Sequence, residues 1–114
     1  MAQAVDERVE RFRRDYLPRL VEKFRPAKVL VFGSRARGDA LKHSDLDLLV
    51  VSDAFADIRW LDRSVRVLDE VPIPFGVELL CYTPEEYARK VEEFGIVRTA
   101  TREGSELLTV PRGV

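Results

Sequence analysis

Two aspartates separated by one residue, with a glycine-serine pair upstream of them, form the most informative pattern in this sequence. Ten residues lie between Gly33-Ser34 and Asp45, and Asp47 follows Asp45 two positions later. Alternate side chains of a strand share a face, so both carboxylates should leave the same side. Carboxylates this close repel each other unless a cation lies between them. Mg²⁺ suits the position, because it commonly binds through one or two carboxylates plus substrate phosphates. A solvated Asp-x-Asp at a strand edge is the alternative.

The Gly33-Ser34 pair follows an apolar, β-branched run and should lie where a strand passes into a helical turn. A glycine there lets the backbone approach a ligand closely, and the unpaired N–H groups of such a turn can bind phosphate. The Ser34 hydroxyl can donate a further hydrogen bond to a phosphate oxygen. Taken alone, such a pair is most often an ordinary turn. Upstream of the two aspartates, it predicts a nucleoside triphosphate site with divalent metal ions.

A third acidic residue, Glu78, lies inside another apolar run, Val77-Glu78-Leu79-Leu80. A carboxylate among apolar neighbours is costly to bury unless it is paired, protonated or metal-bound. If this run is a strand beside the one that carries Asp45 and Asp47, three carboxylates can converge on a two-metal site. In such a site one ion activates an attacking hydroxyl, and the other holds the triphosphate and its leaving pyrophosphate. The alternative is that Glu78 simply faces water on an amphipathic strand.

Two nearby arginines are candidate phosphate ligands, because a guanidinium group binds phosphate oxygens with a planar fork. Arg37 is the better candidate and Arg35 the weaker one, and surface charge on a loop is the alternative for both. His43, the only histidine, is expected to be solvated rather than catalytic.

The elements that must position these residues alternate between helices and short apolar strands. Apolar residues three and four apart predict an amphipathic helix over about the first 24 residues, which Pro18 should kink or restart. Thr83-Pro84-Glu85-Glu86 predicts a capping box that opens a helix to about Phe94. Further patterns predict strands at 28–32, 46–51, 77–82 and 107–110, and helices over about 58–71 and 96–102. The resulting fold class is α/β or α+β, with helices packed on a small mixed β-sheet.

Length and composition limit what else the chain can do. Its 114 residues, 46% of them hydrophobic and 34% charged, fit one domain, expected over 1–114. A formal net charge of −1 does not suggest a polyanion-binding protein, and we expect no direct binding to nucleic acid. No apolar run approaches the length of a membrane span or a signal peptide core. The single Cys81 indicates a buried thiol in a reducing compartment, so a cytoplasmic location is expected.

The pattern as a whole resembles the minimal nucleotidyltransferases of the DNA polymerase β superfamily. Gly33-Ser34, the Arg35-Ala36-Arg37-Gly38 segment and Ser44-Asp45-Leu46-Asp47 carry the resemblance, together with the apolar runs on either side. The likeness covers roughly residues 5 to 110, and it is greatest to the small domains encoded beside a HEPN-domain protein, where the pair acts as antitoxin and toxin.

The resemblance implies an activity and a set of roles. Asp45 and Asp47 would coordinate Mg²⁺, two ions being expected, and a third acid on a neighbouring strand would complete the site. That acid is usually aspartate in the family, whereas the matching position here holds Glu78. Gly33 and Ser34 would bind the triphosphate of ATP.

The implied reaction is transfer of AMP to a hydroxyl, expected to be a tyrosine on a HEPN-domain partner. Two alternatives stay open: a catalytically weak module that neutralises its partner by complex formation, and a nucleotidyltransferase for small molecules such as antibiotics. Whether the chain forms a homo- or hetero-oligomer also stays open.

Overall fold

The computed structural model describes residues 6–38 and 44–110 of the chain. A four-stranded sheet in the order β3-β2-β1-β4 forms its centre. Strand β1 runs antiparallel to both β2 and β4, whereas β2 and β3 are parallel, so the predicted small mixed sheet is confirmed. The strands are β1 (Lys28–Phe32), β2 (Leu46–Val51), β3 (Val77–Tyr82) and β4 (Ser105–Thr109).

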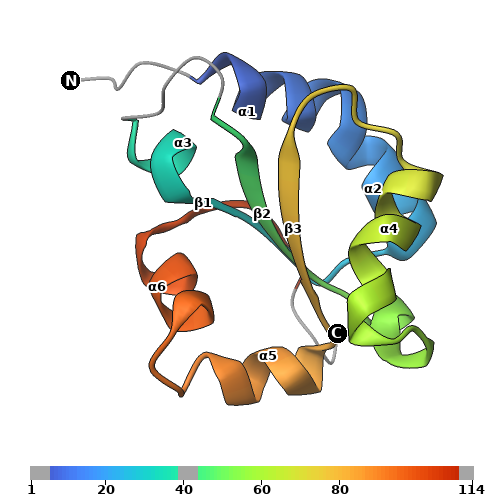
Figure 1. Ribbon diagram of the computed structural model, residues 1–114, viewed down its shortest axis with the longest axis vertical. Helices are drawn as coiled ribbons and strands as arrows, with labels where there is room; N and C mark the ends of the chain where they lie inside the picture. Colours follow the sequence, from blue (N-terminus) through green and yellow to red (C-terminus); the bar gives the residue numbers. More distant parts are fainter. Residues whose placement is uncertain (1–5, 39–43, 111–114) are drawn as a thin grey trace.

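Helices cover both faces of this sheet (Figure 1). One face packs against the N-terminal helical segments and α4, and the other packs against α5 and α6. The helical segments are α1 (Glu7–Arg11), a π-helical turn (Phe12–Tyr16), α2 (Leu17–Phe24), α3 (Gly33–Arg37), a 3-10 turn (Asp53–Asp57), α4 (Trp60–Glu70), α5 (Pro84–Lys90) and α6 (Ile96–Glu103).

Residues 7–24 form the predicted helix, the first five residues of the prediction lying outside the described part of the chain. The interruption expected near Pro18 takes the form of a π-helical turn. The N–H of Leu17 donates to the carbonyl of Phe12, five residues earlier. The wider turn lies where the ring of Pro18 would clash with the preceding helical turn. The apolar residues of this region, Phe12, Leu20 and Phe24, are buried against the sheet.

The alternation of side chains along β2 separates two apolar layers. Leu46, Leu48 and Val50 join the layer under the N-terminal helices. Leu49 and Val51 face the opposite way, into the layer under α5 and α6. Side chains at every second position of a strand share a face, and Asp45, Asp47 and Leu49 are spaced in this way. Both aspartates therefore belong to the face that α5 and α6 cover.

Helix α4 confirms the helix predicted over about 58–71, but two of the apolar residues spaced along it face solvent. Leu61 and Val65 are 77% and 59% exposed, whereas Arg63, Val67 and the following Val71 are buried. Arg63 can lie inside because its guanidinium donates to the Cys81 carbonyl and to the Glu86 carboxylate. The pairing of a buried charge thus overrides the apolar pattern.

The predicted capping box is present at the start of α5, where the side chains of Thr83 and Glu86 bond each other's backbone N–H groups. Helix α5 ends at Lys90 instead of about Phe94, which is 93% exposed. Strand β4 lies about two residues before its predicted position, at Ser105–Thr109.

Candidate active site

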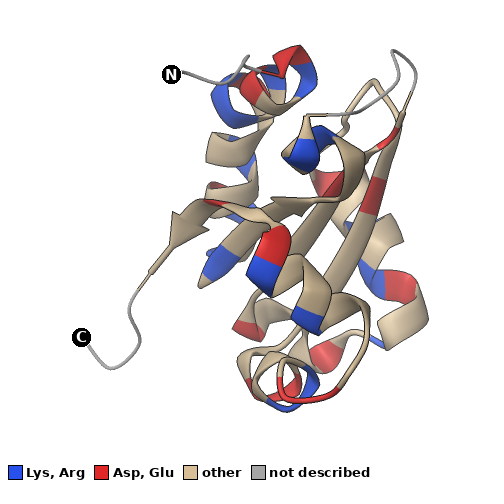
Figure 2. Cartoon of the chain, turned by 90° about the vertical axis from the view of Figure 1, so that its left-hand side faces the viewer, with Lys and Arg blue, Asp and Glu red and all other residues tan. Residues whose placement is uncertain are grey.

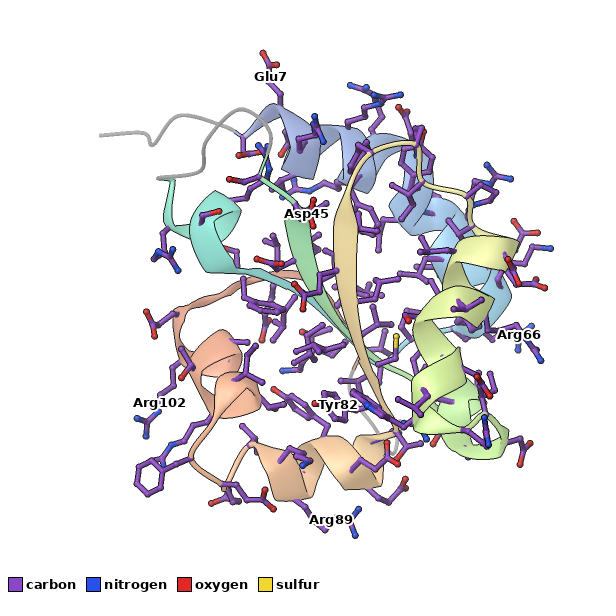
Figure 3. The ribbon with its side chains drawn as sticks, viewed as in Figure 1. Glu7, Asp45, Arg66, Tyr82, Arg89 and Arg102 are labelled. Atoms are coloured by element: carbon purple, nitrogen blue, oxygen red, sulfur yellow. The ribbon has the colours of Figure 1, made fainter. Side chains whose placement is uncertain are left out.

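The register of β2 and β3 brings the three predicted acids to one end of the sheet. Asp47 pairs directly with Glu78 across the parallel strands. Asp45 precedes Asp47 by two residues and therefore lies on the same face. Asp45 and Glu78 are exposed, and Asp47 is half-buried. Figure 3 places Asp45 at one end of the sheet and Tyr82, under the helices, at the other. The three carboxylates thus lie on an accessible part of the face that α5 and α6 cover elsewhere.

Two glycines give the aspartate carboxylates their space. A Cβ built on Gly33 would overlap Asp47 Oδ2, and one built on Gly76 would overlap Asp45 Oδ1. Gly33 also has a φ of +73°, which L side chains rarely adopt. The backbone of Gly76 is held in place because its carbonyl accepts a 3.0 Å hydrogen bond from the N–H of Leu46. Glycine at both positions therefore lets each carboxylate lie directly against the backbone.

Negative charge accumulates at this end of the sheet. Burial raises the pKa of the Asp47 carboxyl above its usual value, and the neighbouring charges of Glu78 and Asp45 raise this pKa further, while Arg37 acts in the opposite direction. Figure 2 shows acidic segments on the neighbouring strands, with basic segments of α3 beside them. An excess of carboxylate charge is what a divalent cation neutralises.

The same three residues offer the hard oxygen donors that Mg²⁺ prefers. Within the part of the chain that the structure describes, no three His, Cys, Asp or Glu side chains are grouped closely enough to hold a metal ion as they stand. Metal binding would therefore require the three carboxylates to turn toward a shared ion. Their donor chemistry, their common face and the space left by the two glycines fit that requirement.

The predicted phosphate turn lies beside these acids. Gly33 begins α3 directly after β1 ends at Phe32, and Phe32 pairs with Asp47 in the antiparallel register. Gly33 and Ser34 are half-buried, and Arg37, at the last position of α3, is exposed. The predicted passage from strand to helical turn is therefore confirmed, and it lies next to the aspartate pair. His43 lies outside the described residues.

Arg35 is not the phosphate ligand that the sequence suggested. Its side chain is only 7% exposed and forms an ion pair with Asp6. It also donates two hydrogen bonds to the carbonyl of Ser44, at 3.1 and 3.0 Å. Because these groups hold the guanidinium inside the fold, it cannot reach a phosphate at the surface.

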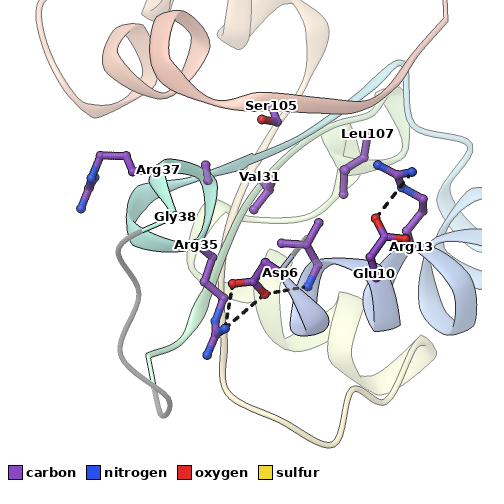
Figure 4. Close-up of a pocket in the computed structure, with 11 residues that line it drawn as sticks. Asp6, Glu10, Arg13, Val31, Arg35, Arg37, Gly38, Ser105 and Leu107 are labelled. Atoms are coloured by element: carbon purple, nitrogen blue, oxygen red, sulfur yellow. Dashed lines mark hydrogen bonds and ion pairs between the residues drawn. The ribbon is translucent and has the colours of Figure 1, made fainter. Parts of the chain in front are cut away.

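A cavity of about 600 Å³ lies between α1, α3 and β4 (Figure 4). Its walls include Val31 and Leu107, which belong to the apolar layer under the N-terminal helices. None of the three acids lines it. Arg37 does line it, so the cavity adjoins the end of α3, whereas the carboxylates lie on the other face of the sheet.

Sequence reasoning missed two contributions to the site. Gly76 directly precedes β3, but no motif marks it as the residue against which Asp45 would lie. The pairing of Asp6 with Arg35 spans 29 positions, and only the tertiary fold brings the two residues together. Asp6 does carry a local signal, because it caps α1 by accepting from the N–H groups of Arg8 and Val9.

Comparison with known proteins agrees with this geometry. A family model for the nucleotidyltransferase domain matches residues 13–103. A Haemophilus influenzae protein named as a probable protein adenylyltransferase, MntA, is 35% identical over 71 residues, which are 60% of this chain and 62% of that relative. This chain therefore matches less than two thirds of the relative's length.

A solved structure gives a similar result. A crystal structure from Sulfolobus solfataricus, provisionally assigned as a nucleotidyltransferase, superposes with a TM-score of 0.51 at 31% identity. The match covers 64% of this chain and 65% of that one.

Proposed function

Because this chain belongs to the nucleotidyltransferase domain family, we propose that it transfers the AMP group of ATP to a hydroxyl of a protein acceptor. The observation that carries the proposal is the pairing of Asp47 with Glu78 across β2 and β3, with Asp45 on the same face and the Gly33-Ser34 turn beside them. The Haemophilus relative is named as a protein adenylyltransferase, which supports a protein acceptor here.

In this proposal the three carboxylates hold Mg²⁺, and two ions are expected. The metal would neutralise charge on the triphosphate and make the attacking hydroxyl a better nucleophile. Asp45 and Asp47 orient the reacting groups from β2, and Glu78 does so from β3. The extra methylene of Glu78, relative to the usual aspartate, extends the carboxylate from an exposed strand position.

The phosphate turn positions the leaving group. The backbone N–H groups of Gly33-Ser34 and the Ser34 hydroxyl would bind triphosphate oxygens, and Arg37 would add charge from the end of α3. The acceptor oxygen then forms a bond to the α-phosphorus while the bond between this phosphorus and the bridging oxygen to the β-phosphate breaks. The products are an adenylylated acceptor and pyrophosphate, and the hydroxyl proton is released to solvent.

The resemblance to minimal nucleotidyltransferases supports a HEPN-domain protein as the acceptor, with a tyrosine hydroxyl as the modified group and silencing of a toxin as the consequence. A substrate of this kind brings its own hydroxyl to the open carboxylate face, so the enzyme needs no enclosed acceptor pocket.

Among residues 6–38 and 44–110, each helix is too short or too polar to cross a lipid bilayer.

Intact-mass spectrometry of the protein encoded beside this chain tests the proposal. The two proteins are incubated with ATP and Mg²⁺, and Asp45→Asn and Asp47→Asn variants serve as controls that keep the shape of each side chain. A mass gain of one or more AMP groups that disappears in both variants is expected. A stable complex without any mass gain, formed equally by all versions, would instead identify a binding module that neutralises its partner by occlusion.

A further inference from the structure

Helix α3 carries the Gly33-Ser34 turn, and its third residue, Arg35, is one of two buried arginines among the described residues. The guanidinium of Arg35 bonds both carboxylate oxygens of Asp6, at 3.1 and 3.0 Å. Its remaining described bonds go to the carbonyl of Ser44, the residue directly before Asp45. Figure 4 shows the side chains of Arg35 and Asp6 meeting between α3 and the start of α1.

This arrangement links three separate parts of the chain through one planar group. Asp6 is fixed because it also caps α1, accepting from the N–H groups of Arg8 and Val9. Arg35 stands one residue after Ser34, and Ser44 stands one residue before Asp45. The fork of a guanidinium can bond a carboxylate and a carbonyl at the same time, which a lysine ammonium cannot do with the same geometry.

We propose that Arg35 is a positioning residue that fixes the phosphate turn at Gly33-Ser34 relative to the Asp45–Asp47 pair. It acts through the backbone on both sides of the site and touches neither nucleotide nor metal. The proposal rests on the proposed function, because it assumes that the turn binds phosphates and that the aspartates bind metal. Reacting groups displaced by about 1 Å can lose about 100-fold in rate, so a clamp that holds these two segments together has a direct effect on catalysis.

The chain offers a matched control for a purely structural role. Arg63 is as deeply buried as Arg35, with a side chain that is 6% exposed. It also bonds one carboxylate, that of Glu86, together with backbone carbonyls, those of Ile58 and Cys81. Cys81 is three residues beyond Glu78 along β3 and lies in the opposite apolar layer, so Arg63 stabilises a part of the fold away from the acids.

The experiment compares Arg35→Lys, Asp6→Asn and Arg63→Lys with the wild-type chain. Asp6→Asn keeps an effective N-cap for α1 but removes the charge that pairs with Arg35, so it tests the clamp if Arg35→Lys does not fold. Stability is measured by urea unfolding, and kcat and KM for AMP transfer are normalised to the folded fraction. The affinity for Mn²⁺ in the presence of an ATP analogue that cannot be cleaved between the α- and β-phosphates is measured by electron paramagnetic resonance.

We expect the two lysine variants to lose stability to a similar extent. Only the clamp variants, Arg35→Lys and Asp6→Asn, should lower kcat and the Mn²⁺ affinity, each by about 10- to 100-fold, as is typical when a residue that orients metal ligands is changed. Their KM for ATP should change by less than about 3-fold. The Arg35→Lys/Asp6→Asn double variant should lose no more kcat than the more impaired of the two single variants, because both changes break the same unit.

Wild-type kcat and Mn²⁺ affinity in folded Arg35→Lys and Asp6→Asn would overturn the proposal, as would an equal loss of both in Arg63→Lys. A wild-type chain that transfers no AMP would contradict the proposed function instead, and the Mn²⁺ affinities would still decide the positioning role.

Discussion

The carboxylate of Asp47 lies beside the negative charges of Glu78 and Asp45, and this placement makes one contribution to the stability of the metal-free protein depend on pH. Burial first, and then these two charges, raise the pKa of Asp47 above its ordinary value of 3.8. The folded state therefore retains this proton at pH values where the unfolded chain has released it. Ionised Asp47 therefore lowers the free energy of unfolding. This loss is absent below the ordinary pKa of Asp47 and complete above its raised pKa in the folded state.

Asp47→Asn should therefore raise the Tm of the metal-free protein at pH 7, by about 1–3 °C for a domain of this size. The gain should shrink as the pH falls toward 4, because wild-type Asp47 then also becomes neutral. Thermal melts in EDTA between pH 4 and 8 measure the difference. A lower Tm for the variant at pH 7 would show that the charges of the site do not oppose folding.

Glu78 stands where the resemblance to minimal nucleotidyltransferases implies an aspartate. Its role can be tested against a matched glutamate. Glu78→Gln should lower AMP transfer by about 100-fold or more, since it removes a charge from the groups that stabilise the transition state. Glu106→Gln, on the edge strand β4, is the control, because Glu106 is also an exposed strand glutamate. Comparable activity of the two variants would mean that Glu78 only faces water and has no role in AMP transfer.

At the scale of elements, the passage from β1 into α3 depends on glycine for two different reasons. Gly33 combines a positive φ with the close approach of Asp47. Gly38, at the end of α3, has a φ of +85°, and no atom of the described residues lies within 4 Å of its Cβ position. Alanine at either position should cost about 1–2 kcal/mol of stability through backbone strain. Only Gly33→Ala should also displace the carboxylate and lower kcat by at least about 10-fold.

Urea unfolding and transfer kinetics of both alanine variants check this prediction. The Gly38→Ala variant controls for strain alone, so an equal loss of kcat in the two variants would show that the contact between Gly33 and Asp47 has no catalytic role.

The central elements could be predicted from the sequence because their signals are local. The strands at 28–32, 46–51 and 77–82 are short apolar runs, and the structure places them within those bounds. The α5 capping box was also evident from four consecutive residues. What could not be predicted depends on contacts distant in sequence, such as the burial of Arg63 against Glu86 in place of Leu61.

The same distinction applies to the candidate site. The positions of Gly33-Ser34, Asp45 and Asp47 follow from one continuous motif. That Glu78 lies directly opposite Asp47 depends on the parallel pairing of β2 and β3, which the sequence allowed but did not require. The burial of Arg35 could not be predicted, because a surface-loop arginine and a buried one have the same local sequence. Contacts made by the tertiary fold, with Asp6 and the Ser44 carbonyl, distinguish them.

At the scale of the whole molecule, Cys81 reports on the integrity of the fold. It is 1% exposed, and burial raises the pKa of its thiol to about 12, against the opposing effect of Arg63. Thiolate is the reactive form, so the native protein should react with a thiol reagent such as DTNB only on unfolding. Labelling in increasing urea should follow the loss of circular dichroism, whereas rapid labelling without urea would show that the layer between the sheet and α4 opens in the native state.

If the carboxylate face of the sheet transfers AMP from ATP to a protein, the α- and γ-phosphates of ATP must end in different products. The chain and the protein encoded beside it are incubated with Mg²⁺ and ATP radiolabelled at either the α- or the γ-phosphate. We predict that the α-label becomes acid-stable on the partner protein, that the γ-label appears in pyrophosphate, and that Asp47→Asn abolishes both. Transfer of the γ-label to protein, or α-labelling that persists in Asp47→Asn, would mean that the carboxylate face does not transfer AMP.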